Sequence, residues 1–208
     1  MGVSAGEVRL KDAIDLVFPL AGSVLRPDYA LPLWQSLRGT LPWLNDEPAA
    51  GILPISGASV GDGMLYLSHR AQLTLRLPQR RVAEAHALSG LQLDLGGGIR
   101  IGEARLRELQ PTSAQYSPLV SFGCGDEEEF LAHCASRLEE MAVRCNLICG
   151  RVKTRAGEAG EISGFSLMLH GLTAEHSLTI QQLGLGDARK LGCGIFVPHK
   201  TATAVGAA

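Results

Sequence analysis

The sequence lacks any apolar run long enough to cross a membrane. A spanning helix needs roughly 18 or more consecutive apolar residues, and no apolar run of this chain approaches that length. The opening stretch, MGVSAGEVRLKD, carries charges where a secretory signal would place its apolar segment. Because 46% of the 208 residues are apolar, a packed core is nevertheless expected. We expect a globular, cytoplasmic protein without membrane contact.

The sequence also lacks the residue patterns of disulfide frameworks, metal sites and serine hydrolases. Its cysteines are odd in number and all lie in the second half, which is more typical of reduced thiols than of disulfides. No HExxH motif, paired CxxC motif or GxSxG motif is present. We therefore expect neither a metal nor a cofactor.

An overall excess of positive charge is missing as well. The formal net charge is −2, which by itself argues against a nucleic-acid partner. The charge is unevenly spread, however. Residues 70–107 contain seven arginines and three acids, whereas residues 126–140 contain six acids. The acids at residues 126–129 suit the first turn of a helix, where they complement the helix dipole. One face of the protein can still be basic.

The first half of the chain predicts the order strand, helix, strands, helix and closing hairpin. The expected elements are strands at 12–20, 51–56, 63–68 and 71–78, helices from Pro27 and at 80–88, and a hairpin at 91–109. In 71–78, Leu73, Leu75 and Leu77 alternate with polar residues. This alternation predicts that Arg76 faces outward.

The second half repeats that order. The expected elements are strands at 117–123, 146–155 and 161–170 and helices at 125–145 and 173–183. Asp126, with Glu129 three residues later, is typical of a helix N-cap, and Thr173 is another. The order predicts an α+β protein of two tandem ferredoxin-like (βαββαβ, RRM-like) domains. We place them at residues 1–112 and 113–208, the second ending in a glycine-rich loop at 184–194.

This loop has the form GxGxxRxxGxGxF. Its glycines and cations are Gly184, Gly186, Arg189, Lys190, Gly192 and Gly194. Glycines allow close backbone approach and expose amide donors, and the cations attract phosphate. A dinucleotide fingerprint would need a preceding strand and a glycine at Arg189, and a Walker loop would need a lysine followed by serine or threonine. The loop therefore predicts a phosphate-rich ligand, or else a tight helix-to-strand connection.

A helix followed by GLGDARKLGCGIFVP resembles the glycine-rich signature of the RAMP superfamily of CRISPR proteins. DLVFPL, LPWL, LTLRLP and LICGR also resemble successive blocks of the Cas-six endoribonucleases, particularly their Myxococcus-type branch, over nearly the whole chain. The resemblance implies two ferredoxin-like folds that bind the repeat hairpin of precursor CRISPR RNA. It also implies metal-independent cleavage by 2′-hydroxyl attack, retention of the product hairpin, and other CRISPR effector-complex subunits as partners.

The resemblance implies a histidine general base at the start of the first helix, but alignment on LPWL places Tyr29 there. A tyrosine, with an ordinary pKa near 10, is a poor base at neutral pH. Its hydroxyl could orient the 2′-hydroxyl or donate to the phosphorane, or the ring could simply pack at the helix start. His69, just before an arginine-bearing strand, could replace the missing base, or it could be an exposed strand-entry residue.

Further arginines are expected to hold the hairpin duplex through its phosphates. These are Arg76, Arg80, Arg81, Arg105 and Arg107. Three hypotheses remain open: a metal-independent endoribonuclease, a non-catalytic hairpin-binding subunit of the same pathway, and a scaffold that binds a small phosphorylated ligand.

Overall fold

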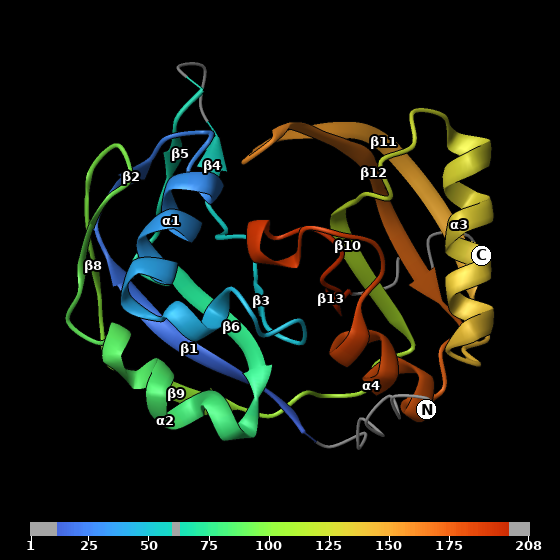
Figure 1. Cartoon of the computed structure of the whole chain (residues 1–208), viewed down its shortest axis with the longest axis horizontal. Helices are drawn as coiled ribbons and strands as arrows, with labels where there is room; N and C mark the ends of the chain where they lie inside the picture. Colours follow the sequence, from blue (N-terminus) through green and yellow to red (C-terminus); the bar gives the residue numbers. More distant parts are fainter. Residues whose placement is uncertain (1–11, 60–62, 200–208) are drawn as a thin grey trace, which may run out of the picture.

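The computed structural model describes residues 12–59 and 63–199. Within these ranges the chain forms helices and mostly short strands (Figure 1). The α-helices are α1 (Ala30–Thr40), α2 (Val82–Ala85), α3 (Glu127–Glu140) and α4 (Ala174–Leu183). The strands are β1 (Ala13–Ala21), β2 (Val24–Leu25), β3 (Gly51–Ile52), β4 (Ala58–Ser59), β5 (Leu65–Tyr66), β6 (Gln72–Pro78), β7 (Gln92–Asp94), β8 (Gly98–Ile101), β9 (Arg105–Arg107), β10 (Ala114–Val120), β11 (Asn146–Gly157), β12 (Gly160–His170) and β13 (Val197–Pro198).

β1 is central to the sheet of the first half. It pairs antiparallel with β6 along one edge and with β9 and β8 along the other, and β3 lies beyond β6. Leu16 lies opposite Leu75 and Phe18 opposite Leu73. All four side chains are buried in one core with α1, because successive residues of a strand point to opposite faces. β2, β5 and β4 form a small separate sheet.

The sheet of the second half has the order β11-β12-β10-β13, with antiparallel neighbours. Phe130 of α3, Ile180 of α4 and Leu167 of β12 belong to a second buried core. β11 forms one edge of this sheet and has β12 as its partner strand. Each half thus has its own sheet, helices and core.

Two predicted helix starts are confirmed. The Asp126 carboxylate accepts a hydrogen bond from the Glu129 amide at 2.9 Å, at the N-terminus of α3. The Thr173 hydroxyl accepts one from the His176 amide at 3.2 Å, at the N-terminus of α4. Both caps satisfy amides that have no partner within the helix.

Other elements of the first half are shorter than the sequence predicts. The expected strands at 51–56 and 63–68 are reduced to the two-residue strands β3 and β5. The helix predicted at 80–88 is interrupted, with 3-10 turns at Gln79–Arg81 and His86–Leu88 flanking the four residues of α2. None of these three short helical segments has a side-chain N-cap, which is consistent with their short length.

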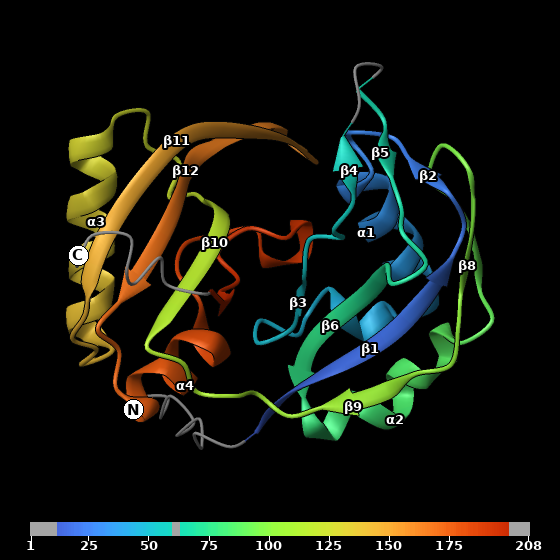
Figure 2. The same ribbon diagram turned by 180° about the vertical axis from the view of Figure 1, so that it is seen from behind.

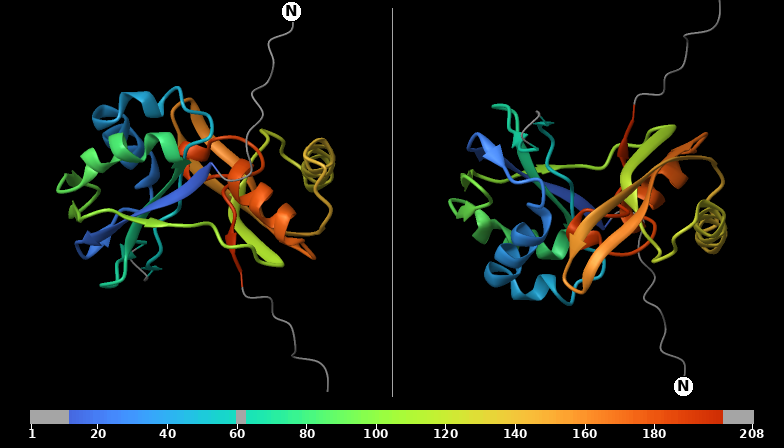
Figure 3. Two further views of the ribbon diagram at one scale, coloured as in Figure 1. Left: turned by 90° about the horizontal axis from the view of Figure 1, so that it is seen from below. Right: turned by 90° about the horizontal axis from the view of Figure 1, so that it is seen from above.

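The two halves lie side by side, and two segments of the second half reach the first (Figure 3). The long hairpin of β11 and β12 arches over, and near its tip Glu158 pairs with Arg38 of α1 at 2.5 Å. The C-terminal segment, with the 3-10 turn η4 (Arg189–Leu191), lies between the two sheets (Figure 2). Leu191 of that turn is buried in the core of the first half. Among the described residues, no helix is long and apolar enough to cross a membrane.

Candidate functional site

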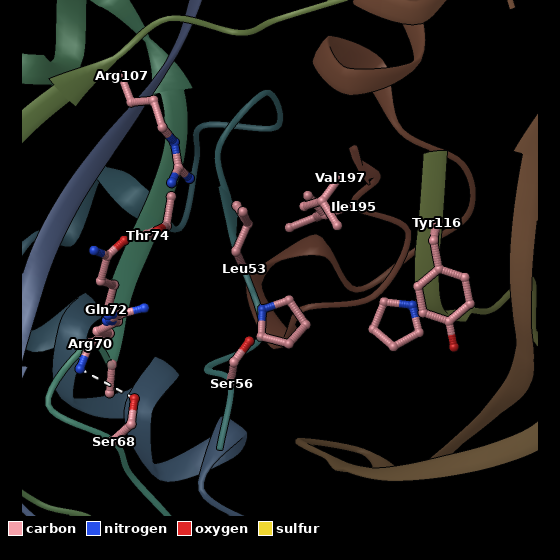
Figure 4. A pocket seen from close by; sticks show the side chains of 13 residues that line it. Leu53, Ser56, Ser68, Arg70, Gln72, Thr74, Arg107, Tyr116, Ile195 and Val197 are labelled. Atoms are coloured by element: carbon pink, nitrogen blue, oxygen red, sulfur yellow. Dashed lines mark hydrogen bonds between the residues drawn. The ribbon is translucent and has the colours of Figure 1, made fainter. Parts of the chain in front are cut away.

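A cavity of about 580 Å³ opens between the two halves, and we call it the central cleft (Figure 4). The wall from the first half is mostly polar, with Arg70, Gln72, Thr74 and Arg107. The wall from the second half carries Tyr116, Pro118, Ile195 and Val197. The cleft therefore places cations and hydrogen-bonding groups opposite an aromatic and apolar wall.

The alternation of β6 builds the polar wall. Leu73, Leu75 and Leu77 point into the core of the first half, so Gln72 and Thr74 point to the opposite face of the sheet. Arg105 and Arg107 of β9 lie opposite Val17 and Asp15 of β1, and both arginines are exposed. This face of the sheet looks toward the second half rather than into open solvent (Figure 2).

Tyr116 of the cleft wall also belongs to an aromatic pair. The Tyr116 ring lies 5.5 Å from the His199 ring, with the two planes at 39°. Such rings offer a surface on which nucleic-acid bases can stack, and nearby cations can hold the phosphates. Tyr116, His199 and Arg70 were not among the residues predicted from the sequence, because the segments that carry them meet only in the tertiary structure.

The prediction that Arg76 faces outward is wrong. Its side chain is 1% exposed and forms an ion pair with Asp15, from Nε to Oδ1 at 2.8 Å. Alternation does turn Arg76 away from its own core, as predicted, but the second half covers that face. A guanidinium enclosed in this way cannot contact RNA phosphates without opening the interface.

The glycine-rich loop packs tightly against the protein itself. All four of its predicted glycines have positive φ, between 65° and 78°. A Cβ on Gly194 would lie 2.0 Å from the Leu185 carbonyl oxygen, and a Cβ on Gly186 would lie 2.3 Å from that of Ser121. The Gly194 amide donates to the Leu119 carbonyl at 2.7 Å. The loop is thus the tight helix-to-strand connection, and this amide is used within the protein.

The two cations of the loop also bind the protein. Arg189 Nη2 donates to the Gln182 carbonyl at 3.1 Å, and Nη1 donates to that of Leu183, at the C-terminus of α4. Lys190 Nζ donates to the Ala50 carbonyl at 2.8 Å. Burial lowers the pKa of Arg189 to about 10, with Arg76 adding to the effect. Burial, with Arg189, lowers that of Lys190 to about 8. Contrary to our expectation, both cations point into the protein.

Tyr29 is an internal anchor at the start of α1. Its side chain is 7% exposed, and its hydroxyl accepts a hydrogen bond from the Ile55 amide at 2.7 Å. Burial raises the pKa of Tyr29, although the Arg155 cation opposes the shift. The adjacent cavity, which Lys190 and Gly192 also line, measures only about 10 Å³. The structure brings these predicted residues together, but without room for a ribose.

His69 lies in the turn before β6 and is exposed. Its chain neighbours Ser68 and Arg70 both line the central cleft. The Arg70 amide donates to the Ser68 hydroxyl at 3.2 Å, which orders this turn (Figure 4). Of the two predicted catalytic residues, His69 is exposed and Tyr29 is buried.

The predicted arginines at residues 80 and 81 lie beside the buried acid Glu47. Arg80 Nη2 is 2.6 Å and Arg81 Nε is 3.4 Å from Glu47 Oε2. Arg81 Nη1 is also 2.8 Å from Oε1 of the exposed Glu84. The Arg81 guanidinium also lies over the Trp43 ring, 4.9 Å from its centroid. These contacts place the pair near α2, while Arg105 and Arg107 belong to the cleft side of the sheet.

A second basic group was missed in the sequence. Arg151 and Lys153 of β11 are exposed, and Arg155 follows at the same spacing of two. The stretch RVKTR contains the signal: Lys153 and Arg155 share a face of the regularly paired part of the strand, while Arg151 lies at the register shift between Cys149 and Val152. Arg155 Nη1 donates to the Leu191 carbonyl, so the stripe runs from solvent toward the glycine-rich loop. In the described part of the chain, no three His, Cys, Asp or Glu side chains are grouped as metal ligands.

Comparison with known proteins identifies the family. The Cas6 family model, described as Cas6 Crispr, matches residues 14–201. The chain belongs to the Cas6 family. This Cas6 chain is 34% identical over 194 residues to the CRISPR-associated endonuclease Cas6 of Myxococcus xanthus, covering 92% of this chain and 84% of that protein.

Solved structures show that the fold is shared. A Cas6-related protein from Pyrococcus furiosus aligns with a TM-score of 0.64 at 15% identity, covering 89% of this chain and 98% of that one. Thermus thermophilus Cse3, solved bound to an RNA representing a pre-cleavage complex, aligns with a TM-score of 0.53 at 16% identity, covering 89% and 98%. The mixed α/β architecture is therefore that of Cas6 proteins.

Proposed function

We propose that this Cas6 chain is an endoribonuclease that processes CRISPR RNA. It binds the repeat stem-loop of precursor CRISPR RNA, cleaves it without a metal, and remains on the product hairpin, where other effector-complex subunits join it. The proposal is supported by the identity to the Myxococcus xanthus endonuclease. The RNA bound to Thermus thermophilus Cse3 supports the class of ligand.

We further propose that each half is one ferredoxin-like domain, with the boundary between residues 112 and 113. The support is strand order. In the second half the order is β11-β12-β10-β13, which is second-third-first-fourth. In the first half, β3, β6, β1 and β9 repeat that order, and in both halves a helix follows the first strand and another follows the third. This is the arrangement of a βαββαβ unit.

The central cleft is the proposed RNA site, and it is the observation that carries the function. Arg70 and Arg107 line one wall, and Tyr116 lies on the other beside His199. Phosphates bind the arginines through charge, and unpaired bases stack on the aromatic rings. A formal net charge of −2 is compatible with this role, because the affinity depends on the local field of the cleft.

The proposed reaction is attack of a ribose 2′-hydroxyl on the adjacent phosphorus. The protein holds the attacking oxygen, the phosphorus and the leaving 5′-oxygen in line. His69 removes the 2′-hydroxyl proton, and a neighbouring cation stabilises the phosphorane. The P–O5′ bond breaks, and the leaving oxygen takes a proton from water. The products are a 2′,3′-cyclic phosphate and a 5′-hydroxyl.

One observation favours a second candidate, a non-catalytic hairpin-binding subunit. The position at which the resemblance implies a general base holds Tyr29, whose hydroxyl is hydrogen bonded to Ile55 in the interior. If His69 does not replace that base, RNA binding remains while cleavage is lost.

Incubating the pure protein with the repeat RNA of its own locus, in excess chelator, separates the two candidates. We expect slow cleavage that leaves a cyclic phosphate end, and we expect His69→Ala to lower the single-turnover rate about 100-fold with unchanged RNA affinity. Tyr29→Phe serves as the comparison variant. If the parent binds the hairpin and never cuts it, the non-catalytic subunit is the better description; if His69→Ala cuts like the parent, another residue is the base.

A further inference from the structure

Arg76 has an environment unlike that of any other predicted RNA-binding arginine. It is 1% exposed, and within the first half its Nε and Nη2 lie 2.8 and 3.2 Å from the two Asp15 carboxylate oxygens. This is a bidentate pair, the arrangement in which an arginine is held most rigidly by a carboxylate. Asp15 is itself buried and also accepts from Arg107 Nη2 at 3.1 Å.

The remaining contacts of Arg76 cross to the second half. Its Nη1 donates to the Gln181 carbonyl at 3.0 Å and to the Phe196 carbonyl at 2.8 Å. Gln181 lies in the last turn of α4, where carbonyls lack partners within the helix and where a cation is favoured. One guanidinium therefore joins β1 and β6 of the first half to α4 and the segment before β13.

These contacts lie at one end of the central cleft. A second cavity, of about 320 Å³, is lined by Arg76 and Asp15, and it shares Arg107 and Val197 with the cleft. The cleft itself, of about 580 Å³, lies between the two walls. Further contacts between the halves lie at η4, at the tip of the β11–β12 hairpin, and between α4 and the end of the first half, where Gln181 Nε2 donates to the Gln110 carbonyl and the Thr112 amide donates to the Ser177 hydroxyl.

We propose that Arg76 is a positioning residue that fixes the orientation of the two halves and thereby the width of the central cleft. The guanidinium is planar and its donors are fixed in direction, so a rotation of one half would break contacts with both carbonyls at once. The link to RNA binding rests on the proposed function; the link to orientation does not.

Backbone residual dipolar couplings of the RNA-free protein test the orientation directly. In the parent, the couplings of residues 13–59 and 63–107 and those of residues 114–198 should fit one common orientation. In Arg76→Met, each set should still fit its own half, and the two sets should no longer fit together. Arg76→Lys keeps a buried cation beside Asp15, but its ammonium group cannot reach both carbonyls. We therefore expect this variant to lose the common orientation as well, and it provides the test if Arg76→Met folds poorly. Arg100→Met, which removes an exposed arginine from β8, is the matched control.

RNA binding supplies the second readout. We expect Arg76→Met to weaken the affinity for the repeat RNA at least ten-fold while leaving the slope of log K against log salt unchanged, because no phosphate contact is removed. A common orientation retained in both Arg76 variants would overturn the proposal, and so would a reduced salt slope in Arg76→Met, which would indicate direct phosphate contact. A parent that binds no RNA would instead contradict the proposed function and leave the orientation result standing.

Discussion

The central cleft and the glycine-rich loop both carry cations, but these cations have different partners. Arg189 and Lys190 of the loop donate to backbone carbonyls of the same chain, and burial lowers the pKa of both. Arg70, on the wall of the cleft, is exposed and forms no ion pair with any described residue. The cations that stand out as a motif thus hold the protein together, while Arg70, which belongs to no motif, is available to a ligand.

The largest effect that the comparison predicts is a loss of stability when a glycine of the loop is replaced. Gly194→Ala should lower the free energy of unfolding by about 2 to 4 kcal/mol, because the new Cβ meets the Leu185 carbonyl oxygen and the backbone has φ of 65°. Chemical denaturation measures the change. Gly125→Ala is the control, since a Cβ there has no neighbour within 4 Å. Equal stability of the two variants would show that the loop is not a packed element.

The next effect should come from the aromatic wall of the cleft. Tyr116→Ala should weaken binding of the repeat RNA by about 1 to 3 kcal/mol, the usual value for stacking one base, and Tyr116→Phe should retain most of the affinity. Fluorescence anisotropy with labelled RNA measures both. If the alanine variant binds like the parent, bases do not stack on this wall.

Replacing Arg70 of the cleft and Arg189 of the loop should give smaller changes, in the salt dependence of RNA binding for the first and in stability for the second. Arg70→Gln should reduce the slope of log K against log salt by about 0.7 to 0.9, the value for one phosphate contact. Arg189→Gln should leave that slope unchanged and lower stability instead, because the α4 carbonyls of Leu183 and Gln182 lose their donor. If Arg189→Gln reduced the salt slope and Arg70→Gln lowered only the stability, the loop rather than the cleft would bind the phosphates.

The smallest effect is the pH dependence that Lys190 contributes. Its pKa is about 8 in the folded protein and 10.5 ordinarily, so between these values the unfolded chain binds more protons. Stability then rises with pH. We expect the free energy of unfolding of the parent, minus that of Lys190→Met, to increase between about pH 8 and pH 10.5 and to be constant below pH 7. A flat difference would mean that the lysine is not buried.

Local chemistry was predictable from the sequence, and tertiary contact was not. The Asp126 and Thr173 caps were found because a cap depends on residues three apart. The alternation of β6 correctly divided its residues between two faces, but it cannot say whether a face meets solvent or another sheet, so Arg76 was misplaced. Predicting the burial of Arg76 would have required knowing that it contacts Asp15 and Gln181, which lie 61 and 105 residues away in the sequence.

The candidate site was predicted in part for the same reason. Arg107, named from the sequence, lines the cleft, and His69 lies in the chain between the lining residues Ser68 and Arg70. Tyr116 and His199 were missed, since their rings meet only when β10 and β13 pair. Alignment correctly identified the place of Tyr29 at the start of α1, but the hydrogen bonds to Ile55 depend on a segment 26 residues away.

The edge position of β11 has a consequence for solubility. A twelve-residue edge strand presents amides and carbonyls that could pair with a strand of another molecule and begin aggregation. Exposed Ile148 and Val152 would favour such pairing, but Arg151 and Lys153 are interspersed with them on the same strand. Two copies aligned antiparallel about this stretch would bring like charges together. The cations of β11 therefore protect the concentrated protein from sheet extension.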